Sequence, residues 1–234
     1  MSQHLDLEEQ EQLEELKHFW KQYGNLISWL LIVVMGSYAG WNAYQYWQRS
    51  QAAQSSAMYD EVERAALDSD TSKLDRALAD MKDKFASTSY AQQAALLAAK
   101  TYHDRGNADA AKAALTWVAD KSSDQGYQAI ARLRLAGELA QAQAYDEAAK
   151  QLTGPFPKEF VPLAADRLGD IYLLQGKKAE ARAEFEKAYK AFEDQVDYRR
   201  LVEVKLNALG VDPKSTTTVG ATPAPSASSP EIKK

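Results

Sequence analysis

A long uncharged stretch near the N-terminus constrains this chain more than any other feature. No Asp, Glu, Lys or Arg occurs between Gln22 and Gln48, and seven of the eleven residues from Leu26 to Gly36 are Leu, Ile or Val. On a membrane-insertion scale those seven side chains together contribute about −2 to −4 kcal/mol. A membrane-spanning helix needs about 20 residues. The stretch therefore predicts one uncleaved transmembrane helix over residues 25–47.

Two other interpretations fit this stretch less well. A cleaved signal peptide has a basic leader and small residues at its end, but here six acidic residues precede the stretch and Tyr and Trp follow it. A buried helix of a soluble protein is disfavoured because the rest of the chain is strongly polar. Orientation is not decided by charge, since Lys17 and Lys21 flank one side and Arg49 and Arg64 the other.

The N-terminal tail, residues 1–24, carries a helical stripe. Leu13, Leu16, Trp20 and Tyr23 recur at helical spacing, which predicts a short helix running into the membrane. It is either a solvated acidic lead-in or a contact site for a partner, and the sequence leaves both open.

After Arg49 the chain is rich in Ala and charged residues and shows no alternation typical of strands. We expect an all-α fold, in which the single transmembrane helix is followed by a solenoid of tetratricopeptide-like (TPR-like) α-α hairpins. The expected TPR-like domain is residues 48–210, and a disordered tail rich in Pro, Ser and Thr follows over residues 211–234. Within the domain, helices are expected over residues 51–68, from a cap at Asp70 or Thr71 to Phe85, and over residues 198–209.

A repeated pattern identifies the hairpins. The third copy has the residues of a tetratricopeptide unit: Leu168-Gly169, Tyr172, Gly176, Ala181, Phe185 and Ala188. Similar residues recur 33 positions earlier, and again 37 positions before those, so repeats are expected at about 92–125, 129–161 and 162–195. In this pattern Gly169 lets the two helices approach closely and Phe185 fills the space between them.

Two local departures from the repeat are predicted. Pro155 breaks the second helix of the second unit, so we expect a short helix and an ordered loop packed by Phe156 and Phe160. The last helix is expected to cap the open end of the stack, using Leu201, Val204, Leu206 and Leu209.

Composition argues against several classes of function. The net charge is −5 and no basic stripe is visible, so a nucleic-acid partner is not expected. Cysteine is absent and the three histidines are scattered, which leaves no pattern for a metal site or a catalytic dyad. We predict no enzyme activity, no metal and no cofactor, and a role in binding other proteins.

The first helices of stacked hairpins line a concave face that can bind a peptide. In the repeat register this predicted groove consists of Leu96, Lys100, Ile130, Leu133, Leu163, Asp166, Asp170, Leu173 and Leu174, with His103 and Gln141 beside them. The alternative is that a neighbouring helix covers some of these leucines.

An ordered series of segments resembles the YfgM family, the ancillary subunit of the bacterial SecYEG translocon. The series comprises Glu14-Glu15-Leu16-Lys17-His18-Phe19-Trp20, then Gly40-Trp41-Asn42-Ala43-Tyr44, Ser89-Tyr90-Ala91, Ala131-Arg132-Leu133-Arg134-Leu135-Ala136 and Val204-Lys205-Leu206-Asn207-Ala208-Leu209. The resemblance covers residues 6–210.

The resemblance implies a single-pass bacterial inner-membrane protein with a cytoplasmic N-terminus and a periplasmic TPR-like domain. It implies association with SecYEG and with the membrane-anchored periplasmic chaperone PpiD, and help in passing unfolded secretory proteins to periplasmic chaperones. No catalytic residues come with it. The alternative is an assembly or scaffold factor for another envelope complex.

Overall fold

The computed structural model describes residues 7–68, 70–193 and 197–213. Over these residues every regular element is a helix and no strand occurs. The predicted all-α class is therefore confirmed. The predicted disordered tail lies, from residue 214 on, outside the described residues, as do residues 1–6 of the N-terminal tail.

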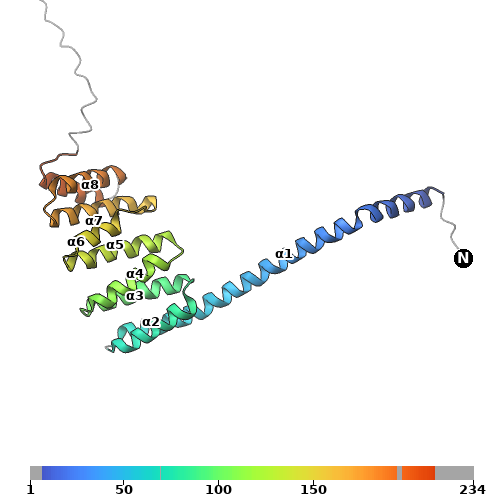
Figure 1. The fold of residues 1–234 in the computed structure, drawn as a ribbon, viewed down its shortest axis with the longest axis horizontal. Coiled ribbons are helices and arrows are strands. Elements are labelled where there is room, and N and C mark those ends of the chain that lie inside the picture. The colour runs from blue at the N-terminus through green and yellow to red at the C-terminus, as the bar shows by residue number, and fades with distance from the viewer. Residues whose placement is uncertain (1–6, 69, 194–196, 214–234) are drawn as a thin grey trace, which may run out of the picture. The chain divides into compact units, whose positions relative to one another are not determined.

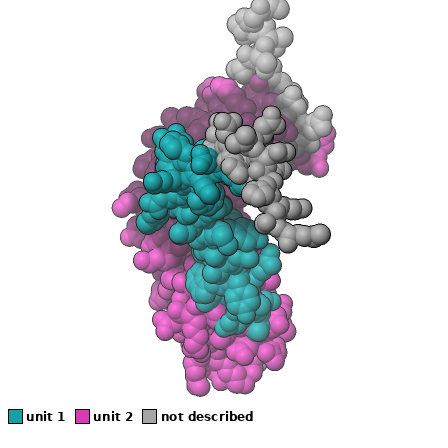
Figure 2. Space-filling model, turned by 90° about the vertical axis from the view of Figure 1, so that its right-hand side faces the viewer, with its two compact units in different colours: residues 1–57 teal, residues 58–234 magenta. Residues whose placement is uncertain are grey.

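The chain divides into two compact units, residues 1–57 and 58–234 (Figure 2). Helix α1 (Leu7–Leu67) forms unit 1 and contributes its last turns to unit 2. It is the one described helix that is long and apolar enough to cross a membrane. Most large apolar side chains of its uncharged stretch are exposed, Leu30 at 59% and Val34 at 56%, which is compatible with a helix surrounded by lipid. The exact ends of the span stay a prediction.

Unit 2 contains the helical hairpins, stacked in chain order (Figure 1). Its elements after α1 are α2 (Thr71–Phe85), α3 (Ser89–Asp104), α4 (Ala108–Lys121), α5 (Gln125–Gln141), α6 (Tyr145–Leu152), the 3₁₀ helix η1 (Lys158–Phe160), α7 (Val161–Leu174), α8 (Lys178–Ala191) and α9 (Asp197–Ala208). Helix α2 begins at the predicted cap, where the Asp70 side chain accepts a hydrogen bond from the Ser72 amide.

The three hairpins α3–α4, α5–α6 and α7–α8 turn in the same way. In each, one amide just after the turn donates to a carbonyl five residues back: Asn107 to Tyr102 at 2.8 Å, Ala144 to Leu139 at 2.9 Å and Lys177 to Tyr172 at 2.9 Å. This is the bond that closes a left-handed helix end. The left-handed residue is Gly106 or Gly176 in two turns and Gln143, with φ of 60°, in the other. The three backbones thus repeat in the predicted register.

Small residues allow the paired helices to pack closely. A Cβ built on Gly169 of α7 would lie 2.5 Å from Cε1 of Phe185 on α8, and Phe185, Ala181 and Ala188 are fully buried. The predicted roles of Gly169 and Phe185 are confirmed. The same seam of buried Ala recurs in the other hairpins, at Ala111 and Ala148.

The second hairpin is irregular as predicted. Helix α6 has only 8 residues and ends at Leu152, ahead of Pro155. Arg132 of α5 holds the loop that follows: Nε donates to the Gln151 carbonyl at 2.8 Å, and Nη1 to that of Pro155 at 2.9 Å. Phe156 packs against the core, and the centre of its ring lies 4.2 Å from the Arg132 guanidinium carbon. Phe160 is half-buried.

Helix α9 packs on the third hairpin as predicted, but only two of the four predicted residues, Leu206 and Leu209, take part. Val202 and Leu206 are fully buried against Phe185 and its neighbours, and Leu209 is partly buried. Leu201 and Val204 are 47% and 63% exposed, so their predicted packing is wrong. Positions 202, 206 and 209 lie on one side of a helix at spacings of four and three, and Val202 was missed because apolar residues occur on more than one side of α9.

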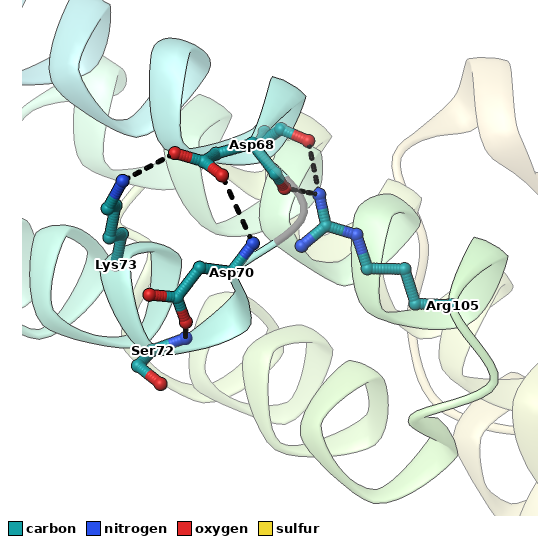
Figure 3. Close-up of polar contacts among 6 residues, drawn as sticks. Asp68, Asp70, Ser72, Lys73 and Arg105 are labelled. Carbon is teal, nitrogen blue, oxygen red and sulfur yellow. Dashed lines mark hydrogen bonds and ion pairs between the residues drawn. The ribbon is translucent and has the colours of Figure 1, made fainter.

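The end of α1 is tied to the hairpins by Arg105, the residue that caps α3 (Figure 3). Arg105 Nη2 donates to the carbonyl of Ala66 at 2.7 Å and to the carbonyl of Asp68. The Asp68 carboxylate accepts from Lys73 Nζ at 2.6 Å and from the Asp70 amide at 3.2 Å. A cation thus satisfies carbonyls that a helix end leaves without intrahelical partners.

Replacing Gly169 by Ala should destabilise unit 2 by about 1–3 kcal/mol, because the new methyl group overlaps the buried Phe185 ring. Gly137→Ala is the matched control. It is also helical, has open space at its Cβ, and should stabilise the protein by up to about 1 kcal/mol. Denaturant unfolding of the full chain in detergent, followed by circular dichroism, measures both. Equal effects of the two substitutions would contradict the close contact.

Replacing Arg105 by Ala should loosen the end of α1. The carbonyls of Ala66 and Asp68, both half-buried residues, lose their donor, at about 0.5–1.5 kcal/mol for each hydrogen bond. Hydrogen exchange of amides 58–68 should become about tenfold faster or more, whereas Arg76→Ala, at an exposed site on α2, should leave it unchanged. Unaltered protection in Arg105→Ala would show that this contact does not hold the helix end.

Candidate functional site on the first helices of the hairpins

A single depression of about 460 Å³ crosses the first helices of all three hairpins. Its lining comes from α3, α5 and α7, with one residue from α4: Ala99, Lys100, His103, Leu115, Leu133, Arg134, Gly137, Glu138, Gln141 and Arg167. We call this depression the groove. Its volume is in the range of ligand-binding pockets, about 300–1,000 Å³.

Part of the predicted groove is brought together here. Lys100, His103, Leu133 and Gln141 were expected on this face and all line the groove. Leu133 is half-buried and packs against the core, while Lys100 and Gln141 are exposed. The result is an apolar floor at Leu133 and Leu115 with polar groups around it.

The other predicted groove residues lie elsewhere. Leu96 is 8% exposed and belongs to the core, and Ile130 packs partly against it. Leu163 is half-buried, whereas Leu173 and Leu174 are exposed at 37% and 58%. None of these five lines the groove, and their contact with a partner stays a prediction.

Helix α9 covers the predicted groove residues Asp166 and Asp170. Lys205 of α9 reaches Asp166 Oδ1 at 2.7 Å and Asp170 Oδ2 at 2.9 Å, and the Tyr198 hydroxyl donates to Asp166 Oδ2 at 2.8 Å. Asp166 is 1% exposed. The alternative noted from sequence was that a neighbouring helix covers some of the leucines. At the third hairpin α9 instead covers these two aspartates, while Leu173 and Leu174 stay exposed.

Burial shifts two pKa values in this cluster. It raises the pKa of the Asp170 carboxyl, and the hydrogen bond from Lys205 opposes that shift. Burial, followed by the hydrogen bond to Asp166, raises the pKa of the Tyr198 phenol to about 12. Both shifts reflect the removal of these groups from water when α9 packs on α7.

Two arginines in the groove were not singled out from the sequence. Arg134 and Arg167 are exposed and lie 33 residues apart, which is the repeat spacing. Each directly precedes the leucine that opens the repeat signature, Leu135 or Leu168. A search for charged residues at equivalent repeat positions would have found them.

The groove also contains one histidine–carboxylate pair. His103 Nδ1 lies 2.8 Å from Glu138 Oε1, and the Glu138 side chain is 12% exposed. Among the described residues no group of three His, Asp or Glu side chains is arranged to hold a metal ion.

Known proteins are similar to this chain over most of its length. A family profile described as "Tetratricopeptide repeat-like domain" matches residues 17–211. A protein of Neisseria gonorrhoeae named "Ancillary SecYEG translocon subunit" is 33% identical over 204 residues, which cover 87% of this chain and 98% of that protein. The chain belongs to the family of ancillary SecYEG translocon subunits.

Further members have the same name and the same extent. The Haemophilus influenzae protein is 29% identical over 203 residues, and the Escherichia coli protein is 25% identical over 206 residues. Each alignment covers 87% of this chain and nearly all of the relative, 98% and 97%. No solved structure matches the chain. The resemblance to the YfgM family is therefore confirmed over the anchor and the hairpins together.

The packing of α9 should make this YfgM-family protein sensitive to alkali. The unfolded Tyr198 phenol loses its proton near pH 10, the folded one near pH 12. The stability that this difference contributes is complete below pH 10 and is lost as the pH rises from 10 to 12. Tyr198→Phe should therefore lower the unfolding free energy at pH 8 and flatten its fall between pH 10 and 12.

The control for this prediction is Tyr46→Phe, at a side chain that is 77% exposed in unit 1. It should leave both the pH 8 value and the alkaline slope of unit 2 unchanged. An equally steep alkaline loss in Tyr198→Phe would contradict the contribution of this hydrogen bond.

Proposed function

We propose that this protein is a membrane-anchored, non-enzymatic binding scaffold that associates with the SecYEG translocon and helps pass secreted proteins to periplasmic chaperones. The observation that carries this proposal is similarity to ancillary SecYEG translocon subunits over 87% of the chain. Because the alignment covers nearly the whole of each relative, the anchor and the hairpins are matched as one arrangement.

The proposed topology is a single pass through the bacterial inner membrane, with residues 1–24 in the cytoplasm and unit 2 in the periplasm. The uncharged, exposed stretch of α1 supports the pass. With this topology the groove opens on the side where secreted chains emerge. A PpiD-like periplasmic chaperone and unfolded secretory proteins are the proposed partners on that side.

The groove supports binding of polypeptide rather than catalysis. It presents Leu133 and Leu115 at its floor and charged groups at its sides, which suits an extended segment that has both apolar and polar side chains. A scaffold for another envelope complex would use the same groove, and only the identity of the main partner separates the two functions.

Photocrosslinking in intact cells tests the proposal. A photoreactive amino acid at Gln141, which is exposed in the groove, should give adducts with translocon subunits, a periplasmic chaperone or secreted proteins in transit. The same amino acid at Lys121, exposed on α4 outside the groove, is the control and should give few adducts. Adducts from Gln141 dominated by another envelope complex would favour the alternative function.

A second comparison separates the groove from the anchor. Leu133→Asp places a charge on the apolar floor and should reduce crosslinking from Gln141 severalfold. Leu67→Asp, at a side chain 85% exposed outside the groove, should not. Circular dichroism of both variants must match the unsubstituted protein, because Leu133 also packs against the core.

A further inference from the structure

The groove lining is positively charged, although the chain as a whole is acidic. The whole chain has a net charge of −5. The groove lining nevertheless contains Lys100, Arg134 and Arg167 against a single carboxylate, Glu138. Each cation comes from the first helix of a different hairpin, α3, α5 and α7 in turn. An acidic protein thus presents a cationic line across three consecutive repeats.

These cations are available to an incoming ligand. Arg134 uses one nitrogen in a long hydrogen bond, 3.5 Å, to the Leu96 carbonyl. Arg167 is exposed, and among the described residues its charge acts on the Asp170 carboxyl without a hydrogen bond or a close ion pair. Lys100 pairs with Asp104 across one exposed turn of α3 at 2.5 Å. Such surface pairs contribute about 0–1 kcal/mol, so a stronger partner can replace Asp104.

The single groove carboxylate is already engaged. His103 Nδ1 lies 2.8 Å from Glu138 Oε1, and the Glu138 side chain is only 12% exposed. Its negative charge is therefore less accessible to a ligand than the three exposed cations. Guanidinium groups also bind carboxylates through two parallel hydrogen bonds, which makes arginine well suited to carboxylate recognition.

We infer that the groove binds an acidic polypeptide segment, in which carboxylates alternate with apolar side chains. The carboxylates pair with Lys100, Arg134 and Arg167, while an apolar side chain contacts the half-buried Leu133. This inference rests on the proposed protein-binding function and adds to it the chemistry of the bound segment.

The segment must come from another protein. Residues 214–234 of this chain contain three lysines and one glutamate, so their charge matches that of the groove instead of opposing it. The acidic residues between Asp6 and Glu15 precede the candidate span, whereas the groove follows it. A single pass places these two regions on opposite sides of the membrane.

Binding of two matched peptides to the full chain tests the inference. The first is a fluorescein-labelled, C-terminally amidated peptide of alternating Leu-Glu-Glu units, and the second has Gln at every Glu position. The protein is held in nanodiscs of zwitterionic phosphatidylcholine, so that no lipid charge competes. The acidic peptide should bind at least about tenfold more tightly, and its affinity should fall as salt is raised.

The variants locate the interaction. Arg134→Gln with Arg167→Gln should weaken binding of the acidic peptide at least about tenfold and leave the Gln peptide unaffected. Lys121→Gln with Lys178→Gln removes the same charge from exposed sites on α4 and α8 outside the groove, and should change affinity less than about twofold. All four sites are exposed, so folding is preserved and circular dichroism checks it.

The outcomes separate this inference from the proposed function. Equal binding of the two peptides, weakened by Leu133→Asp but not by the arginine variant, would overturn the inference and leave polypeptide binding in place. Equal losses in the groove variant and the control variant would also overturn it, since total charge would then be responsible. Failure of both peptides to bind would overturn it as well, and crosslinking from Gln141 would still decide the function.

Discussion

The architecture depends on small residues buried between the two helices of each hairpin, such as Ala111, Ala148 and Ala181. Gly169 leaves no room for a methyl group against Phe185, and Ala181 and Ala188 are fully buried beside that ring. Because small residues form this seam, each hairpin is a thin layer, and layers can stack with their first helices on a common side. The groove lies on that common side. The first helices α3, α5 and α7 use their other faces to pack within and between the hairpins, and this packing leaves the groove side open.

Helix α9 decides where that common side remains open. Lys205 and Tyr198 bind the nearly fully buried Asp166, a carboxylate whose charge would be costly to bury without such partners. These polar contacts, together with a small apolar cluster around Val202 and Leu206, close the C-terminal end of the stack. The third hairpin therefore contributes mainly Arg167 to the groove, and the open surface lies mostly on α3 and α5.

A similar polar device is found at the other end of unit 2. Arg105 caps α3 and donates to carbonyls at the end of α1, so the last turns of the anchor helix are bonded to the first hairpin. The anchor's final turns are thereby part of the folded domain and not a free linker. The first layer of unit 2 therefore includes the last turns of α1, the helix that contains the candidate span.

The sequence by itself determined the helical class, the candidate span and the repeat register. These follow from local rules: an uncharged apolar run, the helical spacing of small residues, and turns in which Gly106 and Gly176 take left-handed conformations. The short α6 was also predictable, because Pro155 cannot continue a helix.

Only the tertiary structure decided which side of α9 is buried and which groove residues it covers. Asp166 and Lys205 are 39 residues apart, and no local pattern specifies such a pairing, since an acidic residue on a helix is compatible with either solvent or a distant cation. Arg134 and Arg167 could have been found at equivalent positions of the repeat. Lys100 does not share that position, and only the stacking of the hairpins brings it to the same surface.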